Sequence, residues 1–241
     1  MAHVSVATPH RSLGAYLARP DGNGPWPGVI VVHDIFGMTD DLRAQADWLA
    51  SAGYVALAPD FFSWGKWLPC LITTMREYRA RRGPVFDDID AVRAWLAQRE
   101  DCTGQIGIIG FCMGGGFAIL MAAGHEFMVS SVNYGEVPAD AQTVLRGACP
   151  VIGSFGGNDR PLRGAAARLE HALKVHGIEC DIKEYPGAGH AFLNRHDTVV
   201  FKLAKLLTGA GYHEASANDA RQRILAFFAR HLAGARSHGL N

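Results

Sequence analysis

The sequence has no surplus of charge of either sign, because 23 lysines and arginines balance 23 aspartates and glutamates. A basic surplus is what draws a protein to nucleic acids or to anionic membrane surfaces. The sequence also has no apolar run that approaches the roughly 20 residues needed to cross a bilayer. We therefore expect no nucleic-acid partner and no membrane partner.

Cysteines are few and do not pair in a recognisable pattern. The five cysteines, at positions 70, 102, 112, 149 and 180, form no CxxC motif, and MAHVSVATPHRSLG does not read as a basic, apolar leader. This pattern is typical of reduced thiols, so we expect a cytoplasmic protein. There is no HExxH motif either, and His125 with Glu126 lacks a second histidine. We expect no metal and no cofactor.

What the sequence does have is a regular alternation of short apolar runs and longer amphipathic stretches. With 241 residues, 49% of them hydrophobic, and no repeat or linker, we expect one domain over residues 1–241. The apolar runs show little polar alternation, which indicates strands buried on both faces. Strands are expected at 28–34, 54–60, 105–110, 128–135, 149–156 and 180–187, and helices at 40–53, 86–100, 163–177 and 217–234. This pattern predicts a mostly parallel, doubly wound α/β sheet with helices on both faces.

Ligands of such sheets bind outside the carboxyl ends of the strands, so the residues at those ends are the first candidates for chemistry. They are Asp34, Asp60, Cys112, Tyr134, Asp159 and His190. We interpret Asp60 as structural, bonded to loop backbone, because it precedes Cys112 in the chain.

Cys112 lies in a turn that is typical of a nucleophile. The segment Gly110-Phe111-Cys112-Met113-Gly114 follows a strand and opens a helix, and its glycines let the two approach around a strained central residue. A helix N-terminus stabilises a thiolate, and the Met113 N–H can point at an oxyanion. Two alternatives stay open. In the first, Cys112 is simply a small apolar residue buried in the turn. In the second, the glycines at 114–116 bind a phosphate, although the usual phosphate-binding motifs GxGxxG and GxxxxGK(S/T) are both absent.

A cysteine nucleophile needs a base and a group that orients the base. Asp159 in SFGGND and His190 in YPGAGHAFLN follow successive strands, in the order acid and then histidine that hydrolases with this turn use. His196 is the nearest substitute for the base. A turn-capping role is the alternative for Asp159.

Residues 61–83 form an unusually long connection, which favours a segment that lines the site. Its basic side chains, Arg81 among them, are candidates for binding a substrate carboxylate, with a solvated helix face as the alternative. Trp64, Trp67 and Phe36 are candidates for an apolar wall, or else for core packing. Residues 195–216 are unassigned and leave room for a short helix.

Four segments in order resemble the dienelactone hydrolase family of α/β-hydrolases: VVHDIFGMTDDLRAQADWLASAGYVALAPDFF, IGFCMGG, SFGGND and YPGAGHAFLN. The likeness runs from about residue 12 to residue 234. It implies the α/β-hydrolase fold, with Cys112, Asp159 and His190 as a triad. It also implies that the backbone N–H groups of Ile35 and Met113 form an oxyanion hole.

The sequence departs from the family pattern at two positions. The family has a glutamate that swings toward the cysteine, whereas this chain has the shorter Asp34 in HDIFG. The arginine that pairs with this glutamate and binds the substrate carboxylate falls where this chain has Asn194, with Arg195 one position on. Asp34, Phe36, Arg81, Asn194 and Arg195 are therefore the candidates for activation or substrate binding.

These residues together predict a cofactor-free hydrolase that cleaves an activated ester or lactone through a thioester on Cys112. We expect a small-molecule substrate, with a carboxylate as one option, and a monomer or small homo-oligomer. Two alternatives are a binding protein on this fold that has lost activation and a broad-specificity carboxylesterase.

Overall fold

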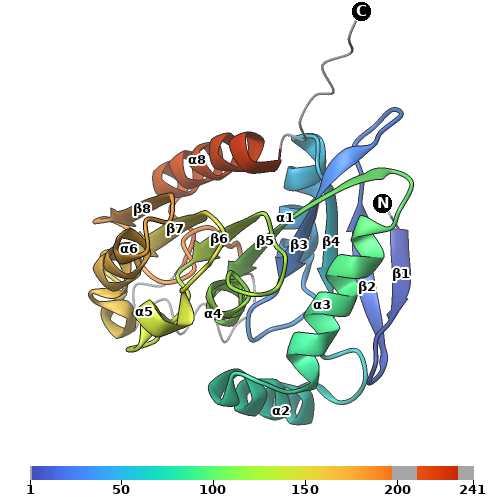
Figure 1. Cartoon of the computed structure of the whole chain (residues 1–241), viewed down its shortest axis with the longest axis horizontal. Helices are drawn as coiled ribbons and strands as arrows, with labels where there is room; N and C mark the ends of the chain where they lie inside the picture. Colours follow the sequence, from blue (N-terminus) through green and yellow to red (C-terminus); the bar gives the residue numbers. More distant parts are fainter. Residues whose placement is uncertain (1, 197–210, 233–241) are drawn as a thin grey trace, which may run out of the picture.

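The computed structural model describes residues 2–196 and 211–232, which are built around one eight-stranded sheet (Figure 1). Across the sheet the strand order is β1-β2-β4-β3-β5-β6-β7-β8. From β3 to β8 all neighbours are parallel, whereas β2 pairs antiparallel with both β1 and β4. The strands are β1 (Ala2–Ala7), β2 (Ser12–Ala18), β3 (Trp26–Val32), β4 (Val55–Pro59), β5 (Cys102–Phe111), β6 (Val129–Asn133), β7 (Val151–Gly156) and β8 (Cys180–Tyr185).

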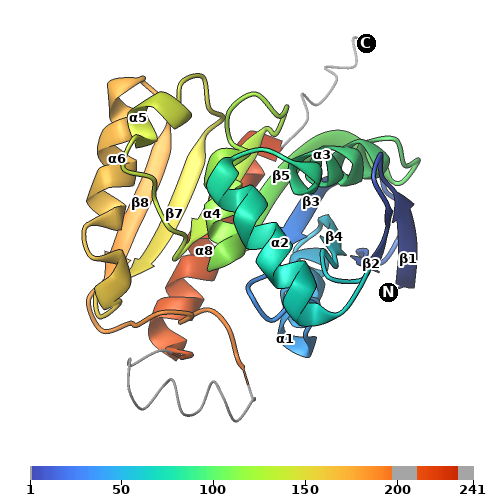
Figure 2. The same cartoon turned by 90° about the horizontal axis from the view of Figure 1, so that it is seen from below.

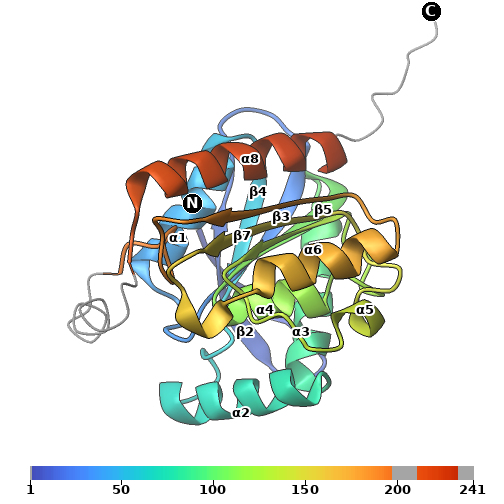
Figure 3. The same cartoon turned by 90° about the vertical axis from the view of Figure 1, so that its left-hand side faces the viewer.

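Helices cover both faces of the sheet, as Figure 3 shows. On one face lie α1 (Asp40–Ser51) and α8 (Glu214–Leu232), and on the other lie α3 (Pro84–Ala97), α4 (Met113–Leu120) and α6 (Ala165–Val175). The helix α2 (Trp67–Ala80) lies outside this second layer, against α3 (Figure 2). Two short elements, α5 (Ala141–Val144) and the 3-10 helix η1 (Arg160–Leu162), complete the described part of the chain.

The hydrophobic core has two halves because side chains alternate along each strand. In β3, Ile30 and Val32 belong to the cluster under α3 and α4, whereas Val29 and Val31 belong to the cluster under α1 and α8. All four are fully buried. This explains why the strands lack polar alternation, and it confirms the mostly parallel sheet that the sequence predicts.

All six predicted strands and all four predicted helices are present in the described residues, with ends that differ by a few residues. The sequence analysis missed the hairpin of β1 and β2, because β1 is largely exposed and carries no apolar run. Buried Asp88 of α3 fastens this hairpin, since it accepts a hydrogen bond from Thr8 (2.6 Å) and pairs with Arg11 (2.8 Å). The short helix considered within 195–216 falls mostly on residues outside the described part.

The described helices include none that is both long enough and apolar enough to cross a membrane.

The turn between β5 and α4 consists of one residue, Cys112, with φ 55° and ψ −114°. Residues other than glycine rarely adopt a positive φ, so the surroundings must hold this conformation in place. The Cys112 N–H donates to the Asn133 carbonyl at 3.0 Å, and the Cys112 carbonyl accepts from the Gly116 N–H at 3.1 Å. The turn is therefore anchored on both sides.

Bare backbone packs on bare backbone around this turn. A Cβ atom on Gly110 would lie 1.9 Å from the Gly114 carbonyl oxygen, and one on Gly114 would lie 2.2 Å from the Val32 carbonyl oxygen. Both distances are far below van der Waals contact, so larger residues force the strand and the helix apart. The glycines of this motif are required by space, as the sequence pattern suggested.

The substitution Gly110→Ala is expected to lower the free energy of unfolding by about 2 kcal/mol or more, because the new methyl group overlaps the Gly114 carbonyl. Urea denaturation measures the change. Gly14→Ala is the matched control, since a Cβ there meets nothing closer than 3.6 Å. Equal losses of stability in the two variants would show that the turn is not so tightly packed.

Candidate active site

Three side chains from the ends of β5, β7 and β8 meet at one edge of the sheet. The Asp159 carboxylate lies 2.6 Å from Nδ1 of His190, and Cys112 lies close enough to the same imidazole to raise its pKa. Asp159 is almost fully buried, His190 is about one-third exposed and Cys112 is half-buried. The structure thus brings together the three residues that the sequence singled out.

The loops that carry Asp159 and His190 are bonded to each other through their backbones. The Gly157 N–H donates to the Tyr185 carbonyl at 2.8 Å, and the Asn158 N–H donates to the Ala188 carbonyl at 2.9 Å. A Cβ atom on Gly156 would lie 2.5 Å from the Gly189 carbonyl oxygen, so a glycine is needed for this approach. The acid and the imidazole are therefore held as one unit.

Tyr134 packs against His190 and helps to hold the imidazole in place. Its ring packs edge-on against the imidazole with centroids 5.3 Å apart, and its hydroxyl donates to the amide oxygen of Asn194. The residue is fully buried and has φ 40°, and its N–H donates to the Ser154 carbonyl at 2.8 Å. The sequence placed Tyr134 at a strand end but gave it no role, because nothing in the local pattern indicates contact with a residue 56 positions away (190 − 134).

The electrostatics favour a proton on His190. Burial alone lowers the pKa of the imidazole, but its hydrogen bonds to Asp159 and Cys112, with the negative charges of those groups, raise the pKa to about 10. Burial instead raises the pKa of the other four thiols, Cys70, Cys102, Cys149 and Cys180. Cys112, by contrast, has the protonated imidazole of His190 beside it.

A second group of residues fixes the loop after β3. His33 is fully buried, and burial lowers its pKa, so the ring is neutral. Its Nδ1 lies 2.6 Å from the Asp34 carbonyl, and its Nε2 accepts from the Phe61 N–H at 3.2 Å. The second bond makes Nε2 the acceptor, so Nδ1 carries the hydrogen. The ring therefore ties this loop to the end of β4.

The two N–H groups expected to form an oxyanion hole belong to segments in backbone contact. Ile35 follows Asp34 in the loop after β3, and Met113 is the first residue of α4, whose N–H has no acceptor within the helix. The close approach of Gly114 to the Val32 carbonyl holds the start of α4 against the end of β3. This packing supports the expectation that the N–H groups of Ile35 and Met113 bind the same oxygen.

Asp34 has a partner that the sequence analysis did not foresee. One carboxylate oxygen accepts from the Phe36 N–H at 2.7 Å, and the other lies 2.9 Å from Nε2 of His196. Both side chains are buried, and the His196 ring packs on Phe36 with centroids 5.1 Å apart. Burial lowers the pKa of His196, but Asp34 more than offsets this, so its pKa is raised. His196 thus pairs with Asp34, whereas His190 pairs with Asp159.

The other candidates for substrate binding are engaged within the protein. Asn194 is buried and donates its amide N–H to Asp41. Arg195 donates its backbone N–H to Asp41 at 2.6 Å and lays its guanidinium over the Tyr212 ring at 4.1 Å. Arg81 forms a two-pronged pair with Asp140, with both distances at 2.7 Å.

The long connection 61–83 contains α2, and its two tryptophans have different surroundings. Trp67 is half-exposed and donates its indole N–H to the Ile35 carbonyl at 3.0 Å. Trp64 donates to the Phe61 carbonyl at 2.8 Å and lies under the guanidinium of Arg11. The sequence grouped these two side chains with Phe36 as one wall; Trp67 contacts the loop that carries Ile35 and Phe36, whereas Trp64 lies under Arg11.

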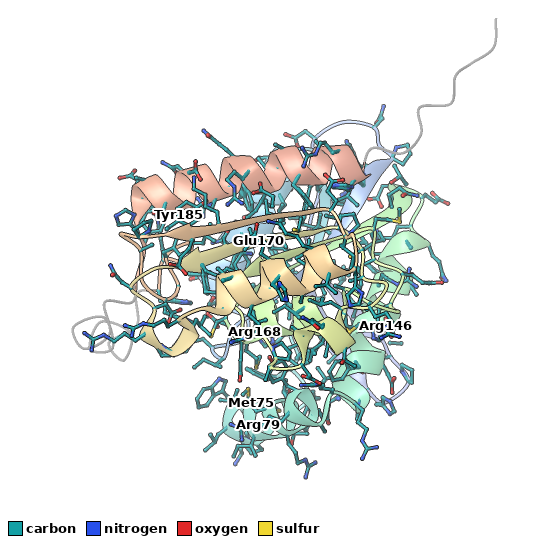
Figure 4. The ribbon with its side chains drawn as sticks, turned by 60° about the vertical axis from the view of Figure 1, so that its left-hand side comes forward. Met75, Arg79, Arg146, Arg168, Glu170 and Tyr185 are labelled. Carbon is teal, nitrogen blue, oxygen red and sulfur yellow. The ribbon has the colours of Figure 1, made fainter. Side chains whose placement is uncertain are left out.

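Other residues near this connection are placed as follows. Asp60 accepts from the Phe62 N–H at 2.9 Å, which confirms its structural role. Tyr78, near the end of α2, lies close enough for the Cys112 charge to act on its pKa, which burial already raises. Figure 4 shows Met75 and Arg79 on α2, below α6 and its Arg168, with Arg146 to one side.

In residues 2–196 and 211–232, no three histidine, cysteine or carboxylate side chains gather as a metal site would require.

Comparison with known proteins gives consistent matches along the chain. The model of the dienelactone hydrolase family matches residues 13–232. A protein of Salmonella typhimurium assigned as a carboxymethylenebutenolidase is 31% identical, with 95% of this chain and 86% of that protein covered. The carboxymethylenebutenolidase of Rhodococcus opacus is 28% identical, with 96% and 93% covered.

A crystal structure assigned as a dienelactone hydrolase, from Klebsiella pneumoniae, superimposes with a TM-score of 0.76 at 28% identity, and the match covers 95% of this chain and 98% of that one. The sheet order and the helical layers are those of the α/β-hydrolase fold. The chain is therefore a hydrolase, and it belongs to the dienelactone hydrolase family.

Proposed function

We propose that this chain hydrolyses small activated esters or lactones, with Cys112 as the nucleophile, His190 as the acid and base, and Asp159 as the group that orients the imidazole. The observation that carries the proposal is the placement of His190 between the Asp159 carboxylate, 2.6 Å away, and the sulfur of Cys112. The names of the relatives, carboxymethylenebutenolidases, support an ester or lactone as the substrate class.

In the first half of the reaction, the Cys112 thiolate attacks the carbonyl carbon and the carbonyl oxygen takes up the negative charge. The N–H groups of Ile35 and Met113 donate hydrogen bonds to that oxygen. The C–O bond to the alcohol then breaks, and the departing oxygen takes the proton from the His190 imidazolium. The product of this half is a thioester on Cys112 and a neutral imidazole.

In the second half, the neutral His190 removes a proton from water, and the resulting hydroxide attacks the thioester carbonyl. The tetrahedral oxyanion is held by the same two N–H groups. Its collapse breaks the C–S bond, releases the carboxylic acid and restores the thiolate beside the imidazolium. Asp159, which is almost fully buried, stabilises that cation in both halves.

The sulfur narrows the substrate class. A thiolate is a better leaving group than an alkoxide, so the first tetrahedral intermediate returns to substrate unless the departing oxygen is itself a good leaving group. Aryl esters and enol lactones meet this condition, whereas simple alkyl esters and amides do not. The proposed enzyme is therefore selective for activated carbonyl compounds.

Replacing Cys112 by alanine is expected to abolish the turnover of phenyl acetate, and Cys112→Ser to lower it by about three orders of magnitude, because a neutral hydroxyl replaces the thiolate. Steady-state kinetics measures both. Cys180→Ala, which changes another half-buried thiol, is expected to keep the activity of the parent protein.

Three results would contradict the proposal. Undiminished turnover by Cys112→Ala would show that Cys112 is not the nucleophile. Binding of phenyl acetate without any turnover by the parent protein would favour the binding-protein alternative. Equal rates on matched aryl and alkyl esters would favour a broad-specificity carboxylesterase.

The alkaline limb of the kcat/KM profile is expected to shift to lower pH in Asp159→Asn. His190 must be protonated to give a proton to the leaving group, and Asp159 raises its pKa, so removal of the charge lets the proton leave about 1 pH unit earlier or more. Phenyl acetate kinetics between pH 6 and about 11 checks this. Asp101→Asn, at the opposite end of β5, is the control and leaves the limb in place. If the alkaline limb did not shift in Asp159→Asn, Asp159 would not be the group that raises the pKa of His190.

A further inference from the structure

The helix α2 carries a line of apolar side chains on one face. Trp67, Leu71 and Met75 recur every four residues and therefore lie on one face of the helix. We call these three residues the α2 stripe. Leu71 and Met75 are partly buried against the same core cluster as Ile35, and the Trp67 indole N–H donates to the Ile35 carbonyl at 3.0 Å. The stripe thus begins at the loop that carries one proposed oxyanion donor.

The stripe also reaches the neighbourhood of the nucleophile. Tyr78, one turn after Met75, lies close enough to Cys112 for the charge of the thiolate to act on its pKa. Its hydroxyl is 3.4 Å from the Glu136 carbonyl, so its one polar atom faces the protein. The helix that carries the stripe consequently extends from the loop of Ile35 to the first turns of α4, where a Cβ atom on Gly116 would lie 2.4 Å from the Tyr78 hydroxyl.

Trp67 is unusually exposed for so large an apolar side chain. Its exposed fraction is 48%, and its single polar atom is already occupied by the Ile35 carbonyl. Leu68 and Ile72, beside the stripe on α2, are 54% and 61% exposed. Exposed apolar groups that adjoin a polar site are typical of ligand-binding surfaces.

Two of the arginines near the described site are already engaged. Arg81 is neutralised by Asp140, and the guanidinium of Arg195 lies on Tyr212. Arg79 is exposed near the C-terminal end of α2, whereas Trp67 is the first residue of the helix. Lys66, the N-cap residue of α2 directly before Trp67, is exposed, so a cation lies at this end of the helix.

We propose that the α2 stripe is the specificity-determining surface of the site, and that it takes an uncharged, apolar acyl or aryl group of the ester. This inference rests on the proposed function. Burial of each added methylene on Trp67 contributes to binding, and the ester carbonyl is held at Ile35, next to the indole. The substrate class is an activated ester or lactone that carries a bulky apolar group.

Two matched ester series test the proposal, because the apolar group can lie on either side of the carbonyl. One series compares p-nitrophenyl acetate with p-nitrophenyl hexanoate, and the other compares phenyl acetate with 2-naphthyl acetate. In at least one series, kcat/KM is expected to be about tenfold higher for the larger ester. In Trp67→Ala that ratio is expected to fall to about threefold or less.

Two further variants separate substrate contact from support of the loop. Trp67→Phe keeps an apolar ring but loses the donor to the Ile35 carbonyl, so the ratio is expected to persist while both rates fall together. Trp64→Ala removes a tryptophan with a similar backbone bond that lies under Arg11, and it is expected to keep the ratio. A purely structural role of Trp67 would lower both esters equally and leave the ratio unchanged.

A carboxylate-bearing ester gives a third comparison. The anion p-nitrophenyl hydrogen adipate has the chain length of the hexanoate and a terminal charge, and it is expected to react more slowly than the hexanoate. A faster reaction of the adipate would overturn the proposal. Flat ratios in both series, or ratios that survive Trp67→Ala, would overturn it as well.

The failure of this inference differs from failure of the proposed function. If turnover depends on Cys112 but the ratio does not depend on Trp67, the inference fails and the proposed chemistry stands. If turnover persists in Cys112→Ala, the proposed function fails and the inference falls with it.

Discussion

The candidate site depends on one contact, the packing of glycine backbone where β5 turns into α4. Because Gly110 and Gly114 have no side chains, the helix begins within touching distance of the strand that precedes it and of the end of β3. That approach lifts Cys112 out of the sheet in a strained conformation. It also aligns the first N–H of α4 with the loop after β3. The proposed nucleophile and the proposed oxyanion donors are consequently set by the same steric constraint.

The remaining parts of the site are added by loops that are bonded to each other. The loops after β7 and β8 share two backbone hydrogen bonds and carry the acid and the imidazole. The residues after His190 are in turn tied to α1, since Asp41 accepts from both Asn194 and Arg195. A chain of short polar contacts therefore links the imidazole side of the site to the opposite helical layer.

Much of this arrangement could be predicted from the sequence. Apolar runs without alternation give the buried parallel strands, and the order of parallel strand ends places Cys112, Asp159 and His190 at one edge. The strained turn follows from the spacing of Gly110 and Gly114. These features depend on residues that are close in the sequence or on the order of the strands, and both can be read directly from the sequence.

Contacts between distant side chains could not be predicted in this way. The pairing of Asp34 with His196 depends on the path of the loop after β8, and no spacing rule relates positions so far apart. The same holds for Trp67 and the Ile35 carbonyl. The hairpin of β1 and β2 was missed for a different reason, because an exposed edge strand carries no hydrophobic signal. Two properties stay predictions: the cytoplasmic location, and an oligomeric state of monomer or small homo-oligomer.

His33 makes the loop after β3 insensitive to pH, whereas the side of the site that carries His190 titrates. Because the ring is neutral and both of its nitrogens are bonded to backbone, it has no proton to gain without giving up the bond to Phe61. A change of pH that removes the proton from His190 thus leaves the loop after β3, which His33 holds, unchanged. Such an architecture lets the proposed acid and base change its protonation without loosening the loop that carries the proposed oxyanion donor Ile35.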